Sequence, residues 1–307
     1  MKAHRLSGTL FAVASALAII LCLIIVIYTV PGLRPLFTYP GFMYLRFEEA
    51  DDGTLKVKYC SRYAAEVEIP SRIGGKAVTR IGEHAFRDCR SLEELVLPDS
   101  ILTIEENAFE RCLSLKKIDI PAGVSEIGAT AFLSAGIETL TVPDNIQSIG
   151  YGSFSLCENL EEATITEGVE SIGTGVFRGC KNLKKAIIPK SATDVGIEAF
   201  AYCENLTSVG GAGSGADVEF GWDGVIPSGV FRNMQNLTEA VLPDGIAIIC
   251  EQAFFGCENL QSVTIPDSVV YIGEYVFSGC GDLTIYGKPG SYAEGYSAEH
   301  NINFEPI

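Results

Sequence analysis

Residues 154–183, FSLCENLEEATITEGVESIGTGVFRGCKNL, contain one full period of a sequence repeat. Three residue types return after 23 positions with unchanged spacing, as Phe154, Cys157 and Leu160 and again as Phe177, Cys180 and Leu183. Between them an alternating apolar run at 163–165 precedes a second apolar stretch that closes with Ile172-Gly173. A unit this small cannot bury its own apolar face, so it must stack on copies of itself.

The same period extends over most of the chain. Its phenylalanines are Phe86, Phe109, Phe132, Phe154, Phe177, Phe200, Phe231, Phe254 and Phe277. The spacing is 23 residues except for one interval of 22 after Phe132 and one of 31 after Phe200. Nine units with about 4.8 Å between parallel strands predict a rod about 43 Å long.

The first apolar run of each unit alternates with period 2, as expected for a strand that points every second side chain inward. Most of these runs end in proline, as in Leu95-Val-Leu97-Pro98, and proline and glycine turn the chain at the corners. The pattern therefore predicts a coil of parallel strands.

The repeat resembles the BspA-like leucine-rich-repeat family, whose unit is similar to L-x-x-I-x-I-P-x-x-V-x-x-I-G-x-x-A-F-x-x-C-x-x-L. The resemblance covers residues 67–283 and implies a leucine-rich-repeat solenoid, a right-handed parallel β coil with short helical turns and about nine 23-residue repeats. Departures are few: Glu105 and Cys250 replace glycine, Thr166 replaces proline, and Ala135 and Met234 replace cysteine. The family is associated with bacterial surface proteins, some of which bind host or matrix proteins and partner microbes, so the resemblance also implies a surface protein with a binding role.

Both ends of the repeat region carry signals of a cap. Residues 42–48 and 55–60 predict a hairpin around Asp52-Gly53. At the other end Ser291-x-x-Glu294 predicts a capping box that opens a short helix, which Asn301 can end. We expect an N-terminal cap at 42–69, repeats at 70–283 with an insertion at 210–224, and a C-terminal cap at 284–307.

The first 30 residues form a separate segment. Residues 8–30 carry no charge and as a helix would reach about 34 Å, enough to cross a bilayer. Lys2 and Arg5 precede this run, which predicts a single-pass anchor with its tip in the cytoplasm and the repeats outside the cell. The alternative is a cleaved secretory signal. Residues 31–41, rich in proline and glycine, predict a stiff stalk.

Composition narrows the range of partners. The net charge of −17 repels phosphate backbones, so nucleic acid is not an expected partner. We also expect no cofactor and no small-molecule substrate. The lipid bilayer is a partner only through the N-terminal segment.

Cysteine, histidine and the carboxylates offer little chemistry. Seven cysteines recur in phase, but parallel neighbours keep Cβ atoms about 4.8 Å apart, beyond usual disulfide geometry. We therefore expect buried free thiols, and no metal site, because ligands spaced 23 residues apart lack the short spacing of zinc sites. His84 and His300 fall at opposite ends of the predicted rod, which argues against a Ser-His or Cys-His pair and against an enzyme.

Two surfaces are candidate ligand contacts. The first is the outward strip of the strands, where Asp119, Thr141 and Thr164 lie beside charged positions such as Lys116-Lys117 and Glu138-Thr139. Its charges alternate between neighbouring repeats, so mutual neutralisation is the alternative reading.

The second candidate is the insertion at 210–224. It contains Phe220, Asp223 and Trp222, the only tryptophan of the chain. Tryptophan is enriched at interfaces, which favours a contact site. The alternative is a tolerated surface loop, because long insertions cost little closure entropy.

The sequence thus predicts a membrane-tethered surface protein with a non-catalytic scaffold that binds protein or glycan. The alternative is a structural or sensory envelope ectodomain that binds a partner of the same cell.

Overall fold

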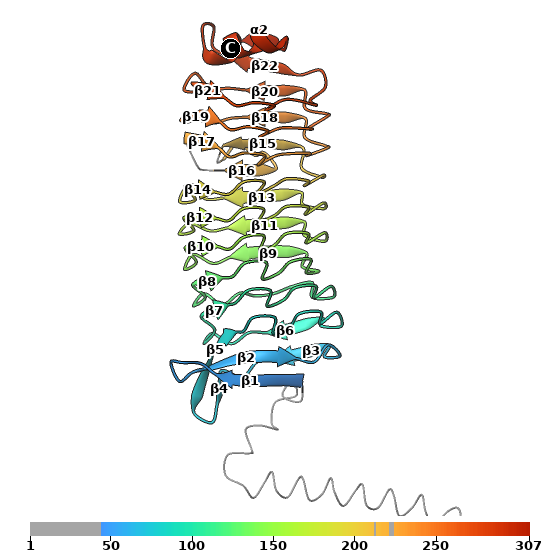
Figure 1. The fold of residues 1–307 in the computed structure, drawn as a ribbon, viewed down its shortest axis with the longest axis vertical. Helices are drawn as coiled ribbons and strands as arrows, with labels where there is room; N and C mark the ends of the chain where they lie inside the picture. Colours follow the sequence, from blue (N-terminus) through green and yellow to red (C-terminus); the bar gives the residue numbers. More distant parts are fainter. Residues whose placement is uncertain (1–43, 212, 221–223) are drawn as a thin grey trace, which may run out of the picture.

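A computed structural model describes residues 44–211, 213–220 and 224–307 of the chain. The described chain forms one elongated coil of about 11 turns, in which two columns of short strands run up opposite sides (Figure 1). The predicted stack of parallel strands is therefore confirmed. The caps add turns to the nine repeats.

The first strand of each repeat builds the main sheet. Its strands lie in the spatial order β9 (Thr139–Val142), β11 (Glu162–Ile165), β13 (Lys185–Ile188), β16 (Val218–Phe220), β15 (Ser208–Gly211), β18 (Glu239–Val241), β20 (Ser262–Thr264), β22 (Thr284–Gly287) and β23 (Asn303–Pro306). All neighbours in this sheet are parallel. Two further first strands, β3 (Glu66–Glu68) and β6 (Glu94–Val96), pair separately near the N-terminal end.

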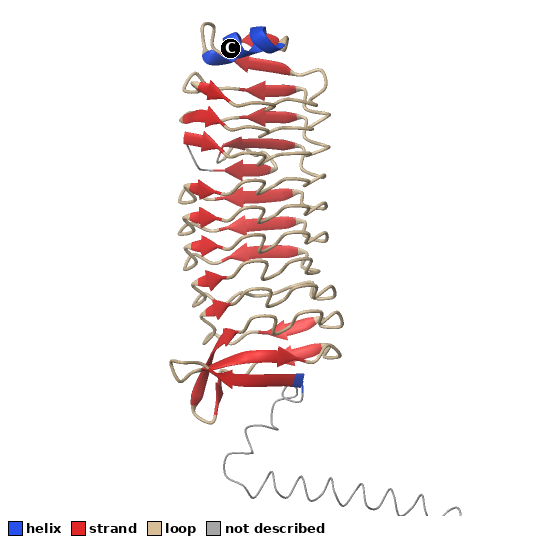
Figure 2. Ribbon diagram, viewed as in Figure 1, coloured by secondary structure: helices blue, strands red, loops and turns tan. Residues whose placement is uncertain are grey.

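The second strands form two further sheets on the opposite side (Figure 2). One contains β1 (Leu45–Glu49), β2 (Leu55–Cys60), β5 (Lys76–Ile81), β7 (Thr103–Ile104), β8 (Glu126–Ile127), β10 (Ser148–Ile149), β12 (Ser171–Ile172) and β14 (Asp194–Val195), with β4 (Arg72–Ile73) beside β5. The other contains β17 (Gly224–Ile226), β19 (Ile246–Ile249) and β21 (Tyr271–Ile272).

The third side of each turn is not helical, which corrects the expectation of short helical turns. In each repeat, the residue two positions before the phenylalanine and the residue two positions after it take the left-handed conformation. Around Phe86 these residues are His84 (φ 58°) and Asp88 (φ 59°). The resulting zigzag aims alternate N–H groups at the next turn: His84, Phe86 and Asp88 donate to carbonyls of residues 106, 108 and 110 at 3.1, 2.8 and 2.8 Å. These bonds between turns offset the cost of about 1–2 kcal/mol for each left-handed non-glycine residue.

The core is a continuous apolar column inside the coil. Its nine repeat phenylalanines are buried, and the centroids of neighbouring rings lie 5.0 to 5.9 Å apart, widening to 6.3 Å between Phe200 and Phe231. The residue that marks each repeat in the sequence therefore lies in the core of the coil.

Both predicted caps contain the expected elements, with one difference. At the N-terminal end β1 and β2 pair antiparallel around Asp52-Gly53, and β2 continues into the coil through β5. At the C-terminal end α2 (Tyr292–His300) ends at Asn301 in a left-handed conformation (φ 54°). The capping box was wrong: Ser291 Oγ makes no cap hydrogen bond, and the Glu294 carboxylate accepts from the Gly290 N–H at 2.6 Å instead.

The insertion is part of the sheet, which corrects its interpretation as a surface loop. After β15 the chain turns back and adds β16 between β13 and β15, with Val209 opposite Val218 and Gly211 opposite Phe220. The extra strand interrupts only the second sheet, where β14 and β17 do not pair. Pro227 contributes to this break. It occupies the repeat position of Gly196, and the Gly196 N–H donates a hydrogen bond to Ile172 O of the turn before at 2.7 Å. Proline has no N–H, so it cannot form the equivalent bond.

In the described part of the chain no helix has the length and apolar character needed to cross a bilayer. The predicted anchor at 8–30 and the stalk at 31–41 lie outside the described residues.

Candidate binding surface

The main sheet presents two outward columns of side chains whose positions are set by strand register. Thr141 lies opposite Thr164, and the same column continues through Ile187, Glu219, Gly210, Val241, Thr264 and Tyr286. Thr141 is exposed and Thr164 half-buried. The structure thus brings these two predicted contact residues together on neighbouring strands.

Asp119 lies one repeat before this sheet, in a segment without regular strand structure. It is exposed, and its carboxylate pairs with Lys117 Nζ at 3.0 Å. Two further exposed pairs connect neighbouring repeats along the same side, Lys116 with Glu138 at 3.0 Å and Lys184 with Glu161 at 2.9 Å. Opposite charges of neighbouring repeats therefore neutralise each other here, and such exposed ion pairs contribute only about 0.2–1 kcal/mol each to stability.

In the described part of the insertion, the aromatic side chain is buried and the two carboxylates accept hydrogen bonds within the protein. Phe220 was a predicted ligand contact, and this prediction was wrong: its side chain is fully buried, 6.1 Å from the Phe231 ring centroid, because β16 places it at an inward position. The Glu219 carboxylate accepts from the Gly213 and Gly215 N–H groups at 2.8 and 3.1 Å. Asp217 accepts from both the N–H and the hydroxyl of Thr207 at 2.7 Å. Trp222 and Asp223 lie outside the described residues.

The cysteine column has a role that the sequence pattern did not reveal. In six repeats the thiol donates to the carbonyl of the phenylalanine one turn earlier, as Cys180 does to Phe154 O at 3.2 Å. Burial raises the pKa of Cys157 and of Cys257 to about 12. All nine cysteines of the described chain are free thiols, and seven of them are buried.

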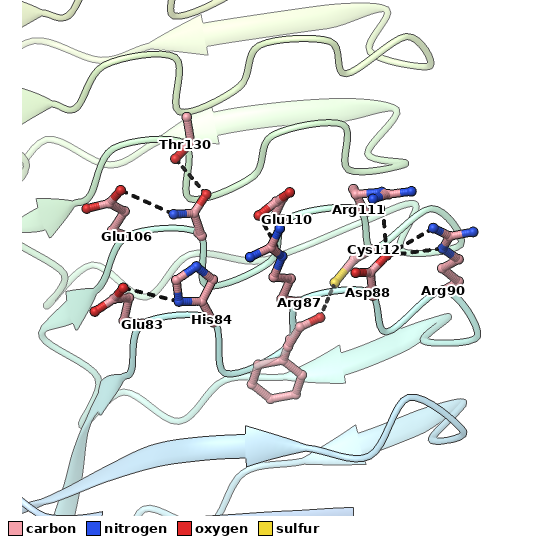
Figure 3. A network of polar contacts seen from close by, with 12 residues as sticks. Glu83, His84, Arg87, Asp88, Arg90, Glu106, Glu110, Arg111, Cys112 and Thr130 are labelled. Carbon is pink, nitrogen blue, oxygen red and sulfur yellow. Dashed lines mark hydrogen bonds and ion pairs between the residues drawn. The ribbon is translucent and has the colours of Figure 1, made fainter.

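A network of charged side chains crosses the first repeats on the left-handed turns (Figure 3). Glu110, only 8% exposed, pairs with Arg87 at 3.0 Å, and Asp88 receives Arg90 at 3.0 Å and Arg111 at 3.4 Å. The hydrogen bond from Arg90 is the largest cause that lowers the pKa of Asp88. Sequence reasoning missed this network, although Arg87 and Glu110 occupy the same repeat position in adjacent units with opposite charge.

The short repeat after Phe132 creates a hollow of about 400 Å³ on the same side. Gly136 is drawn inward so far that an added Cβ would overlap the Leu113 carbonyl oxygen. Arg111, Leu113, Leu156 and Asn159 line the space that the missing residue leaves.

A larger hollow of about 610 Å³ lies between the last repeat and α2, and both Cys280 and His300 line it. The two residues are therefore nearer than the sequence argument allowed. Their hydrogen-bond partners are different, however: Cys280 donates to Phe254 O at 3.3 Å, while His300 Nδ1 contacts Tyr296 O at 2.9 Å. Burial raises the pKa of Cys280 to about 12, the opposite of an activated nucleophile.

Parallel coil, repeat phenylalanines and in-phase cysteines define a leucine-rich-repeat solenoid. Residues 79–207 and 224–295 match the family model of the BspA type leucine rich repeat region in six copies, and the chain belongs to this family. The match indicates a repeat scaffold and no enzyme family.

Several solved structures are similar to this chain. A leucine rich cell surface protein from Faecalibacterium prausnitzii is 20% identical, with 85% of this chain and 96% of that chain covered and a TM-score of 0.45. The T. pallidum leucine rich repeat protein is 20% identical, with 86% of this chain and 96% of that chain covered and a TM-score of 0.43. The pneumococcal vaccine antigen PcpA is 19% identical, with 79% of each chain covered and a TM-score of 0.46. None of the curated proteins matches the chain.

Proposed function

We propose that the chain is a surface-exposed binding scaffold that holds protein or glycan ligands on the outward face of its main sheet. The observation that carries this proposal is the register of β9 to β22, which places Thr141, Thr164 and their equivalents in continuous columns. Each strand from β11 to β22 is held by neighbours on both sides, which makes this face rigid, so little order is lost on binding.

The proposal includes the N-terminal segment. Residues 8–30 serve as a single-pass anchor and residues 31–41 as a stalk, which present the coil at the outer side of the cell membrane. The family's association with bacterial surfaces supports this placement.

A glycan and matrix-protein array probed with the purified repeat region tests the binding role. We expect retention of a small set of ligands. Pull-downs from host material and from the cell's own envelope separate adhesion from a structural or sensory role within the same cell. Retention of no ligand by either route would contradict the proposal.

Trp222 and Asp223 remain candidate contacts of the insertion. If the insertion contributes to binding, Trp222→Ala should weaken the affinity for a ligand found on the array by more than about 1 kcal/mol. Unchanged affinity would remove Trp222 from the contact surface.

A further inference from the structure

The second strands form another exposed face, and its chemistry changes along the coil. Each second strand directs two consecutive side chains away from the core, as Gln147 and Ser148 do between buried Ile146 and Ile149. Before the insertion these pairs are polar except for one leucine: Leu102-Thr103, Ser125-Glu126, Gln147-Ser148, Glu170-Ser171 and Thr193-Asp194. After it they are apolar apart from the hydroxyl of Tyr271: Gly224-Val225, Ala247-Ile248 and Val270-Tyr271.

The apolar residues form one patch because the strands are in register. Val225 lies opposite Ile248, and Ile248 opposite Tyr271. Exposed fractions of 41% for Val225, 65% for Val270 and 51% for Tyr271 leave these side chains in water. Single exposed apolar residues are common, whereas a contiguous group on three neighbouring strands is typical of an interaction surface. We call this group, Val225, Ala247, Ile248, Val270 and Tyr271, the β17–β21 face.

Carboxylates occupy both corners of the turns that bound this face. Glu251 and Glu274 follow β19 and β21, and Asp244 and Asp267 precede them; all four are exposed. Lys288 pairs with Asp267 at 2.9 Å. Within the described residues the other three carboxylates form no ion pair at 4.0 Å or less. An apolar centre with a negative rim complements a surface of apolar and basic side chains.

We propose that the β17–β21 face is a docking surface for a protein segment in which apolar side chains alternate with lysine or arginine. A second copy of the chain fits poorly, because it would bring two negative rims together in a protein of net charge −17. Anionic lipid headgroups are repelled for the same reason. This inference goes beyond the proposed scaffold role, since it concerns the opposite face and names the chemistry of the partner.

Fluorescence anisotropy with three 12-residue peptides tests the docking surface, using the full-length protein in phosphatidylcholine nanodiscs and empty nanodiscs as background. The peptides alternate Leu with Lys, Leu with Glu, and Ser with Lys. We expect the Leu/Lys peptide to bind at least tenfold more tightly than either of the others. Equal affinity for the Leu/Lys and Leu/Glu peptides, or no binding of the Leu/Lys peptide, would overturn the proposal.

Variants locate the binding. The double substitution Val270→Gln with Tyr271→Ser copies the polar pair Gln147-Ser148 and should weaken the Leu/Lys peptide at least tenfold. Leu102→Ser, which removes an isolated exposed leucine from the polar part of the same side, should leave its affinity unchanged. An equal loss in both variants would contradict a localised site.

Rim reversal gives a second readout that leaves the apolar patch intact. Glu251→Lys with Glu274→Lys should weaken the Leu/Lys peptide and strengthen the Leu/Glu peptide, each at least fivefold. No exchange of preference would contradict the charge argument. Sedimentation and vesicle binding test the other partners. Self-association, or binding to anionic vesicles, would contradict the proposal if it disappears in the Val270→Gln, Tyr271→Ser variant, because the face would then bind a second copy or a lipid surface.

Discussion

Cysteine three positions after the phenylalanine meets two requirements of a buried site. It is small enough for the turn, and its thiol donates to a phenylalanine carbonyl of the previous turn, as Cys112 does to Phe86 O at 3.1 Å. Spacing alone predicted burial and the free thiol. It could not reveal the acceptor, because that carbonyl lies 26 residues away along the chain.

Raised thiol pKa values predict a loss of stability in alkali. An unfolded thiol ionises near pH 9, whereas folded Cys157 and Cys257 hold their protons to about 12. Between these values the unfolded state releases protons that the folded state keeps, so the free energy of unfolding falls as pH rises, by about 1.4 kcal/mol per pH unit for each such thiol. Below about pH 9 this contribution is fully present.

Urea unfolding at pH 8, 9 and 10 measures this decline. Other groups also titrate in this range, so Cys157→Ala is the matched variant. We expect its decline with pH to be shallower than that of the unaltered chain. Identical slopes would show that the thiol is not the titrating group.

The phenylalanine column predicts the cost of a core truncation. Phe177 is fully buried between Phe154 and Phe200, with centroids 5.9 and 5.4 Å away. Phe177→Ala should lower the free energy of unfolding by about 3–5 kcal/mol in urea titration. Tyr151→Ala, at a residue 60% exposed, is the control and should change it by under about 0.5 kcal/mol. Similar values for both would mean that the column does not stabilise the coil.

Among the elements, the insertion shows where sequence reasoning fails. Its strand β16 spans only three residues and follows a glycine-rich stretch, so the alternation of Val218 and Phe220 was too short to detect. The regular strands were predictable because identical residues recur in phase. The pairing of β16 between β13 and β15 depends instead on the chain folding back, which no local pattern encodes.

Phe220 and Trp222 should respond differently to truncation. Phe220 closes the core beside Phe231, so Phe220→Ala should cost about 3–5 kcal/mol of stability. Trp222→Ala should cost less than about 0.5 kcal/mol if the residue serves as a ligand contact. Chemical denaturation of both variants measures the contrast. A large loss for Trp222→Ala would make it a packing residue.

The whole molecule is a rod whose two sheet faces have different chemistry. The main face carries mixed polar columns, whereas the opposite face is polar up to β14 and apolar from β17 onward. The rod and its stacking were predictable from the period of 23 residues. The break between β14 and β17 was not, because it depends on the extra strand β16, whose pairing no local pattern encodes.

Topology is a prediction at this scale. Protease added to intact cells should remove the coil and leave residues 1–30 with the membrane, because the charged tip precedes the apolar run. Mass spectrometry of the cell-associated and released peptides measures this. A coil fully protected in intact cells but digested after lysis would reverse the orientation.

The central claim is that ligands bind on the main face, and one coil turn offers a matched pair of variants. Thr141 in β9 and Ser148 in β10 are both exposed, and their strands belong to different sheets. Both substitutions, Thr141→Arg and Ser148→Arg, add the same bulk and charge.

The deciding measurement is the affinity of these two variants for the ligands retained on the glycan and matrix-protein array. The account predicts that Thr141→Arg weakens binding at least tenfold, about 1.4 kcal/mol, while Ser148→Arg leaves it within twofold. Equal effects of the two substitutions, or a loss confined to Ser148→Arg, would contradict binding on the main face.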